Sequence, residues 1–200
     1  KKKKGGTDFE EWVIEGAKSS TSSVRFQIVD AREGSSEQLP KPNSLYEEGI
    51  VGVIIPGSHS MVTDREPWSE RLAEWIRAAV VDVRVQFLGI CYGHQLLAHA
   101  LGGEVGYLPT KECGWTVLNW NKDLIQSDPL FRAALDGLNI GNEEAAIVCH
   151  SQTVLKPPVS CQAVLATSDL DSCQAARLLS NVWSTQFHPE FDTIVGSGYA

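Results

Sequence analysis

The chain has 200 residues and a formal net charge of −8; 42% of the residues are hydrophobic and 21% are charged. A chain of this length forms one domain and buries a core without needing disulfides or a structural metal. Once the four positive charges of residues 1–4 are set aside the rest carries −12, and this acidic body argues against a nucleic-acid platform, which depends on clustered Lys and Arg.

The N-terminal residues and the five cysteines give further expectations. Residues 1–6 are predicted to be a solvated tail, and residues 7–200 a single domain. The cysteines are odd in number and form no Cys-x-x-Cys pair, which is typical of a reducing compartment and gives no zinc signature. The lysine run lacks the apolar stretch of a signal peptide, and the longest apolar runs are shorter than a membrane span. We therefore expect a cytoplasmic protein without membrane association, metal or cofactor.

The first half of the chain alternates helix-like and strand-like patterns. A capping box at its start predicts a helix over residues 7–18. Strands are predicted at 24–29 and at 51–57, the second as a fully apolar run that ends at Pro-Gly. A helix is expected from Pro67 onward, because proline is tolerated in a first helical turn and apolar residues then recur at helical spacing. Its two tryptophans are interpreted as core anchors.

The second half continues the alternation. Helices are predicted over 93–103 and 129–135, and strands at 83–89, 115–120, 145–149, 163–168 and 182–187. Alternating strands and helices predict an α/β fold, with a doubly wound, mostly parallel central sheet flanked by helices in flavodoxin-like layers. Because such a sheet normally begins with a strand, we expect this chain to lack its first strand and a C-terminal helix.

The segment Gly89-Ile90-Cys91-Tyr92-Gly93 joins a predicted strand directly to a predicted helix. Strand–Gly-x-Cys-x-Gly–helix is the nucleophile-elbow arrangement, with sulfur in place of a serine oxygen. The glycines let strand and helix approach closely, and the helix N-terminus favours thiolate over thiol. The other four cysteines are interpreted as buried structural residues: Cys113, Cys149, Cys161 and Cys173.

A thiolate that attacks a carbonyl needs a base, a group that orients the base, and donors for the oxyanion. His188 ends a predicted strand, and Glu190 lies two residues further on, where side chains of a strand face the same way. His94 and His99 follow the elbow on its helix and are expected to be satisfied helix positions. The sequence therefore predicts Cys91, His188 and Glu190 as nucleophile, base and orienting group.

Backbone amides are the expected oxyanion donors. One is that of Tyr92, which directly follows the proposed nucleophile. The other is expected from the loop after the apolar strand at 51–57, through Gly57 or Ser58.

Three spaced motifs, "PGSHS", "GICYGHQ" and "QFHPEF", resemble the class I, triad-type glutamine amidotransferase domain, especially free-standing members similar to the glutaminase part of GMP synthase. The resemblance spans about Val51 to Asp192. It implies hydrolysis of the glutamine side-chain amide through a γ-glutamyl thioester, releasing ammonia and glutamate. It also implies that Gln95 contacts the substrate, and that the segment 149–154, with His150 and Ser151, holds the α-amino and α-carboxylate groups.

Two departures from the family pattern keep alternatives open. Relatives often carry an aspartate where Gln152 stands and a serine where Cys149 stands, and an aspartate would help to recognise a substrate ammonium. The substrate is therefore glutamine or another γ-glutamyl small molecule, and the alternatives are a γ-glutamyl peptidase or a non-enzymatic redox or binding member. Because the chain contains no nucleotide-binding glycine loop, a synthase that receives the ammonia would have to be a separate partner.

Overall fold

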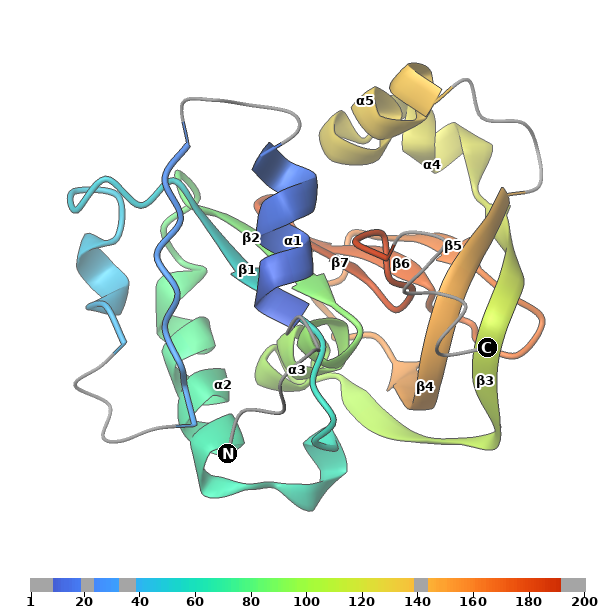
Figure 1. The fold of residues 1–200 in the computed structure, drawn as a ribbon, viewed down its shortest axis with the longest axis horizontal. Coiled ribbons are helices and arrows are strands. Elements are labelled where there is room, and N and C mark those ends of the chain that lie inside the picture. The colour runs from blue at the N-terminus through green and yellow to red at the C-terminus, as the bar shows by residue number, and fades with distance from the viewer. Residues whose placement is uncertain (1–8, 19–23, 33–38, 139–143, 192–200) are drawn as a thin grey trace.

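The structure is a computed structural model that describes residues 9–18, 24–32, 39–138 and 144–191. Within these ranges a seven-stranded sheet with the order β1-β2-β7-β6-β5-β3-β4 forms the centre (Figure 1). The strands are β1 (Gly52–Ile55), β2 (Gln86–Ile90), β3 (Glu104–Trp120), β4 (Glu144–Lys156), β5 (Ala163–Thr167), β6 (Ala175–Leu179) and β7 (Val182–Thr185). The predicted α/β fold with flanking helices is therefore confirmed.

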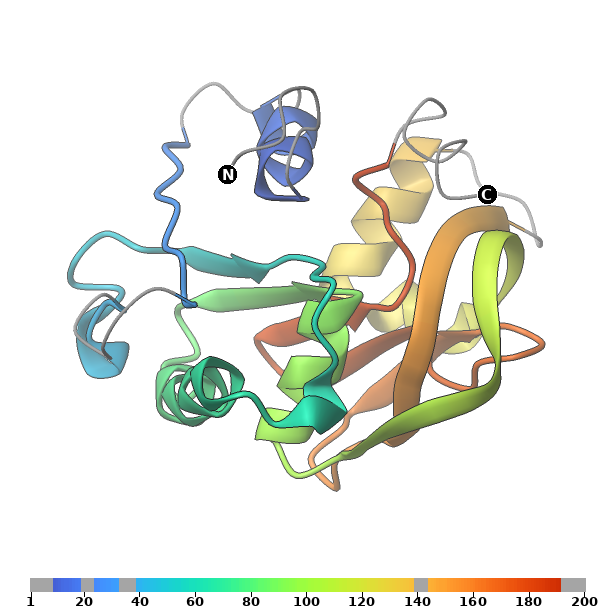
Figure 2. The ribbon, with the colours of Figure 1, turned by 60° about the horizontal axis from the view of Figure 1, so that its bottom comes forward.

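The sheet is mixed, so the expectation of a mostly parallel sheet was wrong for one half of it. β1, β2 and β7 run parallel, whereas β7–β6, β6–β5, β5–β3 and β3–β4 are antiparallel pairs. For the β5–β6 and β6–β7 pairs the reason is the length of the connections, because these strands follow one another through short turns and a parallel crossover needs about a dozen residues or more. Figure 2 shows the long antiparallel ribbon that β3 and β4 form.

Five helices lie in the described residues: α1 (Phe9–Lys18), α2 (Pro67–Ala79), α3 (Tyr92–Ala100), α4 (Lys122–Ser127) and α5 (Pro129–Leu138). Short 3-10 turns lie at η1 (Pro42–Ser44) and η2 (Val62–Asp64). In Figure 2, α1 and α2 lie on opposite sides of β1 and β2. The helix predicted over residues 7–18 is confirmed from Phe9 onward, and those predicted from Pro67, after the elbow and from Pro129 are confirmed, but α4 was not predicted. The capping residues before Phe9 lie outside the described residues.

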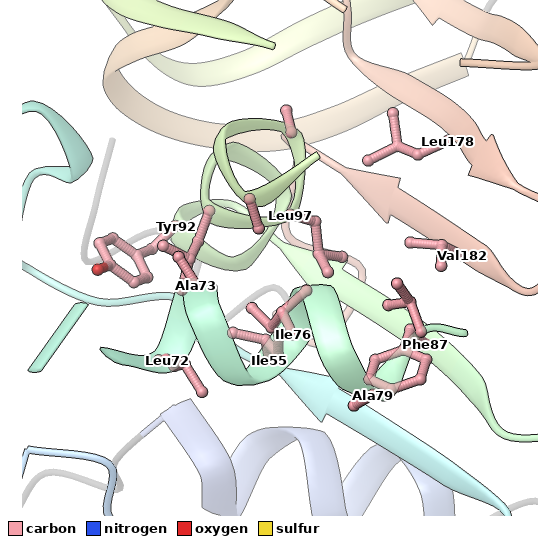
Figure 3. Packing of buried hydrophobic residues seen from close by; sticks show 14 of the residues in the cluster. Ile55, Leu72, Ala73, Ile76, Ala79, Phe87, Tyr92, Leu97, Leu178 and Val182 are labelled. Carbon is pink, nitrogen blue, oxygen red and sulfur yellow. The ribbon is translucent and has the colours of Figure 1, made fainter. Parts of the chain in front are cut away.

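The main core lies where α2 and α3 pack against the parallel strands. Leu72 and Ile76 of α2, Leu97 of α3 and Phe87 of β2 belong to one buried cluster (Figure 3). Each such side chain contributes about 1.5–3 kcal/mol by leaving water. The two tryptophans of α2 pack against this cluster, which confirms their interpretation as core anchors. The packing fixes α3, and with it the start of that helix, against the sheet.

Several predicted strands differ from those observed. The segment 24–29 is extended but pairs with no strand among the described residues, and Val24 and Ile28 are 47% and 60% exposed. No neighbouring strand among the described residues offers hydrogen-bond partners to this backbone, so the alternating pattern alone does not make a strand. The predictions at 115–120 and 145–149 mark only parts of β3 and β4, and β6 was missed. Within the described ranges, every helix is too short or too polar to cross a membrane.

Candidate active site

Cys91 occupies the sharp turn between β2 and α3, as the sequence predicts. It is the N-cap residue of α3, with φ 52° and ψ −99°. Positive φ is uncommon for a residue with a Cβ, and such strain gathers at functional sites. The backbone holds the turn in place: the Cys91 N–H donates to the Thr185 carbonyl of β7 at 2.8 Å, and the Cys91 carbonyl accepts from the Gln95 N–H at 3.2 Å.

The two glycines of the elbow are there for steric reasons. A Cβ on Gly93 would overlap the carbonyl oxygen of Ile55, on β1. A Cβ on Gly89 would lie 2.5 Å from the Gly93 carbonyl oxygen and 2.6 Å from Leu97 Cδ1. Since a side chain at either position would push α3 off the sheet, the glycines allow the close approach that raises Cys91 above the strand ends.

His188 and Glu190 form a buried pair behind Cys91. The Nδ1 atom of His188 lies 2.7 Å from Glu190 Oε1, and each side chain is 3% exposed. The His188 N–H donates to the Ile147 carbonyl of β4 at 2.9 Å, and the ring of Phe191 stacks on the imidazole at a centroid distance of 4.2 Å. Hydrogen bonds therefore hold His188 at its Nδ1 atom and at its backbone N–H, and Phe191 covers one face of its imidazole.

The environment of His188 favours its protonated form. Burial by itself lowers the pKa of this imidazole, but hydrogen bonds to Cys91 and Glu190, with the negative charge that both partners can carry, raise it to about 9. An imidazole of this basicity can accept a thiol proton and keep it close to the sulfur.

A cavity of about 160 Å³ opens beside this arrangement, and it brings together residues far apart in the sequence. Cys91 and His188 line it, and so do the oxyanion candidates Ser58 and Tyr92 and the three substrate candidates. Its described lining is Phe9, Ser58, His59, Ser60, Met61, Cys91, Tyr92, Gln95, Lys111, Cys149, His150, Ser151, Gln152 and His188. A second hollow, of about 410 Å³ near Trp120 and Leu165, has no cysteine or histidine in its described lining.

Two of the expected oxyanion residues, Ser58 and Tyr92, line this cavity, whereas Gly57 is not part of its lining. Gly57 is buried, and a Cβ there would be 3.1 Å from His188 Cε1, so this backbone passes directly beside the imidazole. Ser58 lines the cavity, and its hydroxyl accepts from the Ser60 N–H at 3.1 Å. Tyr92 is fixed by a 2.6 Å hydrogen bond between its hydroxyl and Ser69, and burial raises the pKa of its phenol to about 12.

The three substrate candidates line the cavity, but two of them are tied mainly to the protein. The Gln95 amide nitrogen donates to the Gln152 carbonyl at 2.7 Å and to Gln186 Oε1 at 2.9 Å. The ring nitrogens of His150 contact the Gln152 carbonyl and Glu112, each at 2.9 Å. Ser151 is half-buried. The side chains of Gln95 and His150 thus shape the segment 150–152, which faces the cavity.

Glu112 is the centre of a polar network that sequence reasoning missed. Its carboxylate accepts hydrogen bonds from Thr116 and Ser168 at 2.8 Å and from Gln174 at 2.8 Å, besides its contact with His150. We call this set the Glu112 network. Burial raises the pKa of the Glu112 carboxyl, but these hydrogen bonds outweigh burial, so the pKa lies below its usual range. The network holds β4 to β3 and to the turn after β5.

Asp171 extends this network behind His150. Its Oδ1 atom accepts from Thr153 Oγ1 at 2.6 Å and from the Cys173 N–H at 2.8 Å, and burial raises the pKa of its carboxyl. Donor atoms of Glu112, His150 and Asp171 lie within 4.8 Å of one another, a spacing that could suit a metal ion. The ring nitrogens of His150 have hydrogen-bond partners at 2.9 Å, Glu112 and the Gln152 carbonyl, whereas Asp171 Oδ2 has none among the described residues.

Other histidines and cysteines of the chain divide as follows. His99 contacts Glu70 and is a satisfied helix position, as expected. His94 Nδ1 contacts Ser184 Oγ at 2.8 Å and burial lowers the pKa of its imidazole to about 3, but its Nε2 atom has no hydrogen-bond partner of normal geometry among the described residues, so this position is satisfied only in part. The interpretation of four buried structural cysteines was wrong for Cys113, which is exposed, and for two half-buried residues, Cys149 and Cys161. Cys113 lies on the long β3–β4 ribbon, which the sequence did not reveal, and its side chain is exposed there.

Phe9 and Lys111 also line the cavity and were not predicted. The Phe9 ring stacks on His188 at a centroid distance of 5.9 Å. Nothing in the local sequence marks either residue, because each reaches the cavity only through the packing of α1 or the register of β3.

The fold and the site define an α/β protein that carries a cysteine on a nucleophile elbow beside a histidine–glutamate pair. The sequence profile described as "Glutamine amidotransferase class-I" matches residues 8–196. The chain therefore belongs to the class I glutamine amidotransferase family, as the motifs indicated.

Individual relatives agree with this assignment. A "GMP synthase [glutamine-hydrolyzing]" of Aeropyrum pernix is 35% identical over 172 residues, which are 84% of this chain and 28% of the relative. A "Gamma-glutamyl peptidase 5" of Arabidopsis thaliana is 26% identical over 188 residues, 94% of this chain and 64% of the relative. A solved glutamine amidotransferase of Thermotoga maritima shares the fold, with a TM-score of 0.72, 20% identity, and coverage of 92% of this chain and 72% of that one. The chain thus spans about a quarter of the length of the GMP synthases it matches.

Proposed function

We propose that the protein hydrolyses the side-chain amide of glutamine, with Cys91 as nucleophile, His188 as base and Glu190 as the group that orients His188. The observation that carries this proposal is the shared cavity: Cys91 at a strained elbow and His188 line the same small space, and Glu190 lies 2.7 Å from the Nδ1 atom of His188. Thiol, imidazole and carboxylate in this order are a complete set for acyl transfer.

The reaction proceeds in two halves. His188 takes the thiol proton, and the Cys91 sulfur attacks the amide carbon; as the C–N bond breaks, His188 donates a proton to the nitrogen and ammonia leaves. A γ-glutamyl thioester remains on Cys91. Water then attacks the thioester carbon and gives a proton to His188; the C–S bond breaks, glutamate leaves, and the proton returns to the sulfur.

Backbone amides stabilise the negative oxygen that develops in both halves. We assign this role to the N–H of Tyr92, at the first turn of α3, together with the N–H of Gly57 or Ser58. The Tyr92 N–H belongs to a helix N-terminus, whose partial positive charge favours an anion. Losing one such donor costs about 2.7–4 kcal/mol of transition-state stabilisation.

The segment 150–152 is the proposed binding site for the amino-acid end of the substrate. Gln152 is 1% exposed and lines the cavity, and its Oε1 atom has no hydrogen-bond partner among the described residues. A buried acceptor of this kind can take a hydrogen bond from a substrate ammonium, although a neutral amide binds a cation less strongly than a carboxylate does. Free glutamine is therefore expected to bind with modest affinity.

A γ-glutamyl peptidase is the second candidate, and the similarity to gamma-glutamyl peptidase 5 over 94% of this chain favours it. The same three residues would cleave a γ-glutamyl peptide bond, releasing an amine in place of ammonia. Lys111, at the cavity, could pair with the additional carboxylate of a peptide such as glutathione. If the protein instead serves a synthase, that partner would receive the ammonia, and glutamine hydrolysis would rise when it is added.

The experiment that tests both candidates measures glutamate release from glutamine and from glutathione by the wild type and by Cys91→Ala. We expect the wild type to release glutamate from at least one substrate and Cys91→Ala to be slower by about 10⁶-fold, the loss found when a nucleophile is removed. The substrate with the higher kcat/KM decides between the candidates. Equal rates in the two proteins would refute the assignment of Cys91.

A further inference from the structure

Two cysteines outside the proposed triad lie side by side on the β3–β4 ribbon, at the right of Figure 1. Cys113 and Cys149 are directly opposed in the antiparallel register, and their Sγ atoms are 2.8 Å apart. Directly opposed residues have Cα atoms about 4.5–5.5 Å apart, inside the range of about 4.4–6.8 Å that disulfides span. Because an S–S bond is about 2.05 Å long, the sulfurs need to approach by only about 0.8 Å.

The two thiols differ in access, which gives them different roles. Cys113 is exposed, whereas Cys149 is half-buried and lines the cavity of the candidate active site. Lys111, two residues before Cys113, hydrogen-bonds Cys149, and the charges of Cys149 and then Cys113 raise the pKa of its ammonium. The exposed sulfur of Cys113 is open to reagents in solution, and the half-buried sulfur of Cys149 lies directly beside it.

We propose that Cys113 and Cys149 are a redox-active dithiol in the wall of the cavity, and that low-molecular-weight disulfides such as oxidised glutathione convert it to an intramolecular disulfide. This inference does not depend on the proposed glutamine hydrolysis. It concerns a modification site separate from Cys91.

The exchange takes place in two balanced steps. The Cys113 thiolate attacks one sulfur of oxidised glutathione, forming a mixed disulfide and releasing one glutathione thiolate. The Cys149 thiolate then attacks the Cys113 sulfur, forming the protein disulfide and releasing the second glutathione. The two protein thiols lose two electrons and two protons, and these reduce one oxidised glutathione to two reduced molecules.

The order of these steps follows from the surroundings of Cys149. Burial first, and then the hydrogen bond and negative charge of Cys113, raise the pKa of the Cys149 thiol to about 11. Once Cys113 is in a mixed disulfide, its sulfur is the group that the neighbouring Cys149 sulfur, 2.8 Å away in the reduced protein, can attack. The exposed sulfur therefore reacts first, and the half-buried one resolves the mixed disulfide.

The test uses the full chain, reduced and then incubated with oxidised glutathione, with free thiols blocked by alkylation before digestion without reductant. We expect the wild type to lose two of its five titratable thiols, to give a peptide cross-linked through Cys113 and Cys149, and to regain both thiols with dithiothreitol. Cys113→Ser and Cys149→Ser should give no intramolecular cross-link. Cys161→Ser is the matched control and should form the cross-link at the wild-type rate.

Three results would overturn the proposal. One is that the wild type keeps all five thiols although a cysteine-containing reference peptide in the same tube forms a mixed disulfide with glutathione. Another is a cross-link between other cysteines, such as Cys161 and Cys173, in place of this pair. The third is a Cys113–Cys149 cross-link that forms only after the far-UV circular dichroism of the wild type has been lost. Because these readouts count thiols rather than turnover, they stay independent of the proposed enzymatic activity.

Discussion

The two walls of the cavity are built by different means. The elbow wall is set by backbone geometry within five residues, where Gly89 and Gly93 allow α3 to meet the sheet and Cys91 takes positive φ. The ribbon wall is set by long-range polar contacts, in which Glu112 joins His150, 38 residues away, and Gln174, 62 residues away. The comparison teaches that the proposed nucleophile depends on local shape, whereas the proposed substrate segment depends on distant partners.

Substitutions in the two walls should therefore change different kinetic parameters. A change at the elbow or at its His188–Glu190 pair should act on the rate of the chemical step. A change in the Glu112 network should act on the binding of substrate, because the segment 150–152 lines the cavity without being the proposed nucleophile. The ratio of the effects on kcat and KM therefore separates the two walls.

Among substitutions that leave Cys91 in place, the largest effect is expected for Glu190→Gln. The amide keeps the shape of the 2.7 Å contact with His188 but loses its charge, so the imidazolium formed in the reaction is no longer stabilised. We expect kcat to fall by about 10²–10⁴-fold with little change in KM, measured by steady-state glutamate release. Glu104→Gln, which changes an exposed ion pair with Lys156, is the matched control and should keep the wild-type kcat. An unchanged kcat in Glu190→Gln would contradict the role of Glu190.

Gly93→Ala tests the elbow wall by stability. The added methyl group would overlap the Ile55 carbonyl oxygen, and the backbone of β1 cannot move aside without disturbing the sheet. We expect the free energy of unfolding to fall by about 3 kcal/mol or more, measured by urea denaturation. Gly16→Ala, where a Cβ meets nothing within 4 Å, should be neutral or stabilising by about 0.5–1 kcal/mol. Equal stabilities of the two variants would refute the steric account.

Glu112→Gln tests the ribbon wall. The Glu112 carboxylate accepts hydrogen bonds from four partners. The glutamine side chain has an NH₂ group in place of one carboxylate oxygen, so the buried donors that bonded to that oxygen would face another donor. We expect the free energy of unfolding to fall by about 2 kcal/mol and KM to rise about tenfold, while kcat changes less. The exposed Glu74→Gln serves as control. A fall in kcat at constant KM would remove the distinction between the two walls.

The smallest effect is expected from pH. The pKa of His188 is raised to about 9 in the folded protein, above its ordinary value of 6.5. Protonated His188 therefore favours the folded state; this contribution is complete below about pH 6.5 and is lost as pH rises through about 9. We expect wild type to lose about 1 kcal/mol more stability between pH 7 and pH 8 than His188→Gln, by urea denaturation at each pH. Parallel curves for the two proteins would contradict the raised pKa.

The sequence could reveal the elbow wall because its signals are local. Gly89 and Gly93 around Cys91 mark a close approach of strand and helix. The His188–Glu190 pair was expected from strand alternation, but β7 ends at Thr185, so the pair meets in the bend and turn that follow this strand. The α/β fold could be inferred for the same reason: apolar runs bounded by Gly and Pro mark strands wherever they pair.

The ribbon wall could not be predicted, because its register is a property of two strands together. Nothing near Glu112 indicates that it lies opposite His150, and nothing near Cys113 indicates Cys149. The two-residue turn between β6 and β7 makes this pair antiparallel, where βα alternation favoured parallel strands. The segment 24–29 shows the reverse case, since it has a strand pattern but no paired neighbour in the described part of the chain.

The most direct test of the account is covalent labelling of Cys91 by a glutamine analogue that carries an electrophilic carbon at the amide position. Peptide mass mapping should find one label per chain, on Cys91, and His188→Ala should slow the labelling by about 10²-fold or more, because the thiol loses its base. Labelling that spreads over the other cysteines, or that proceeds equally fast in His188→Ala, would contradict the central claim that these two side chains act together.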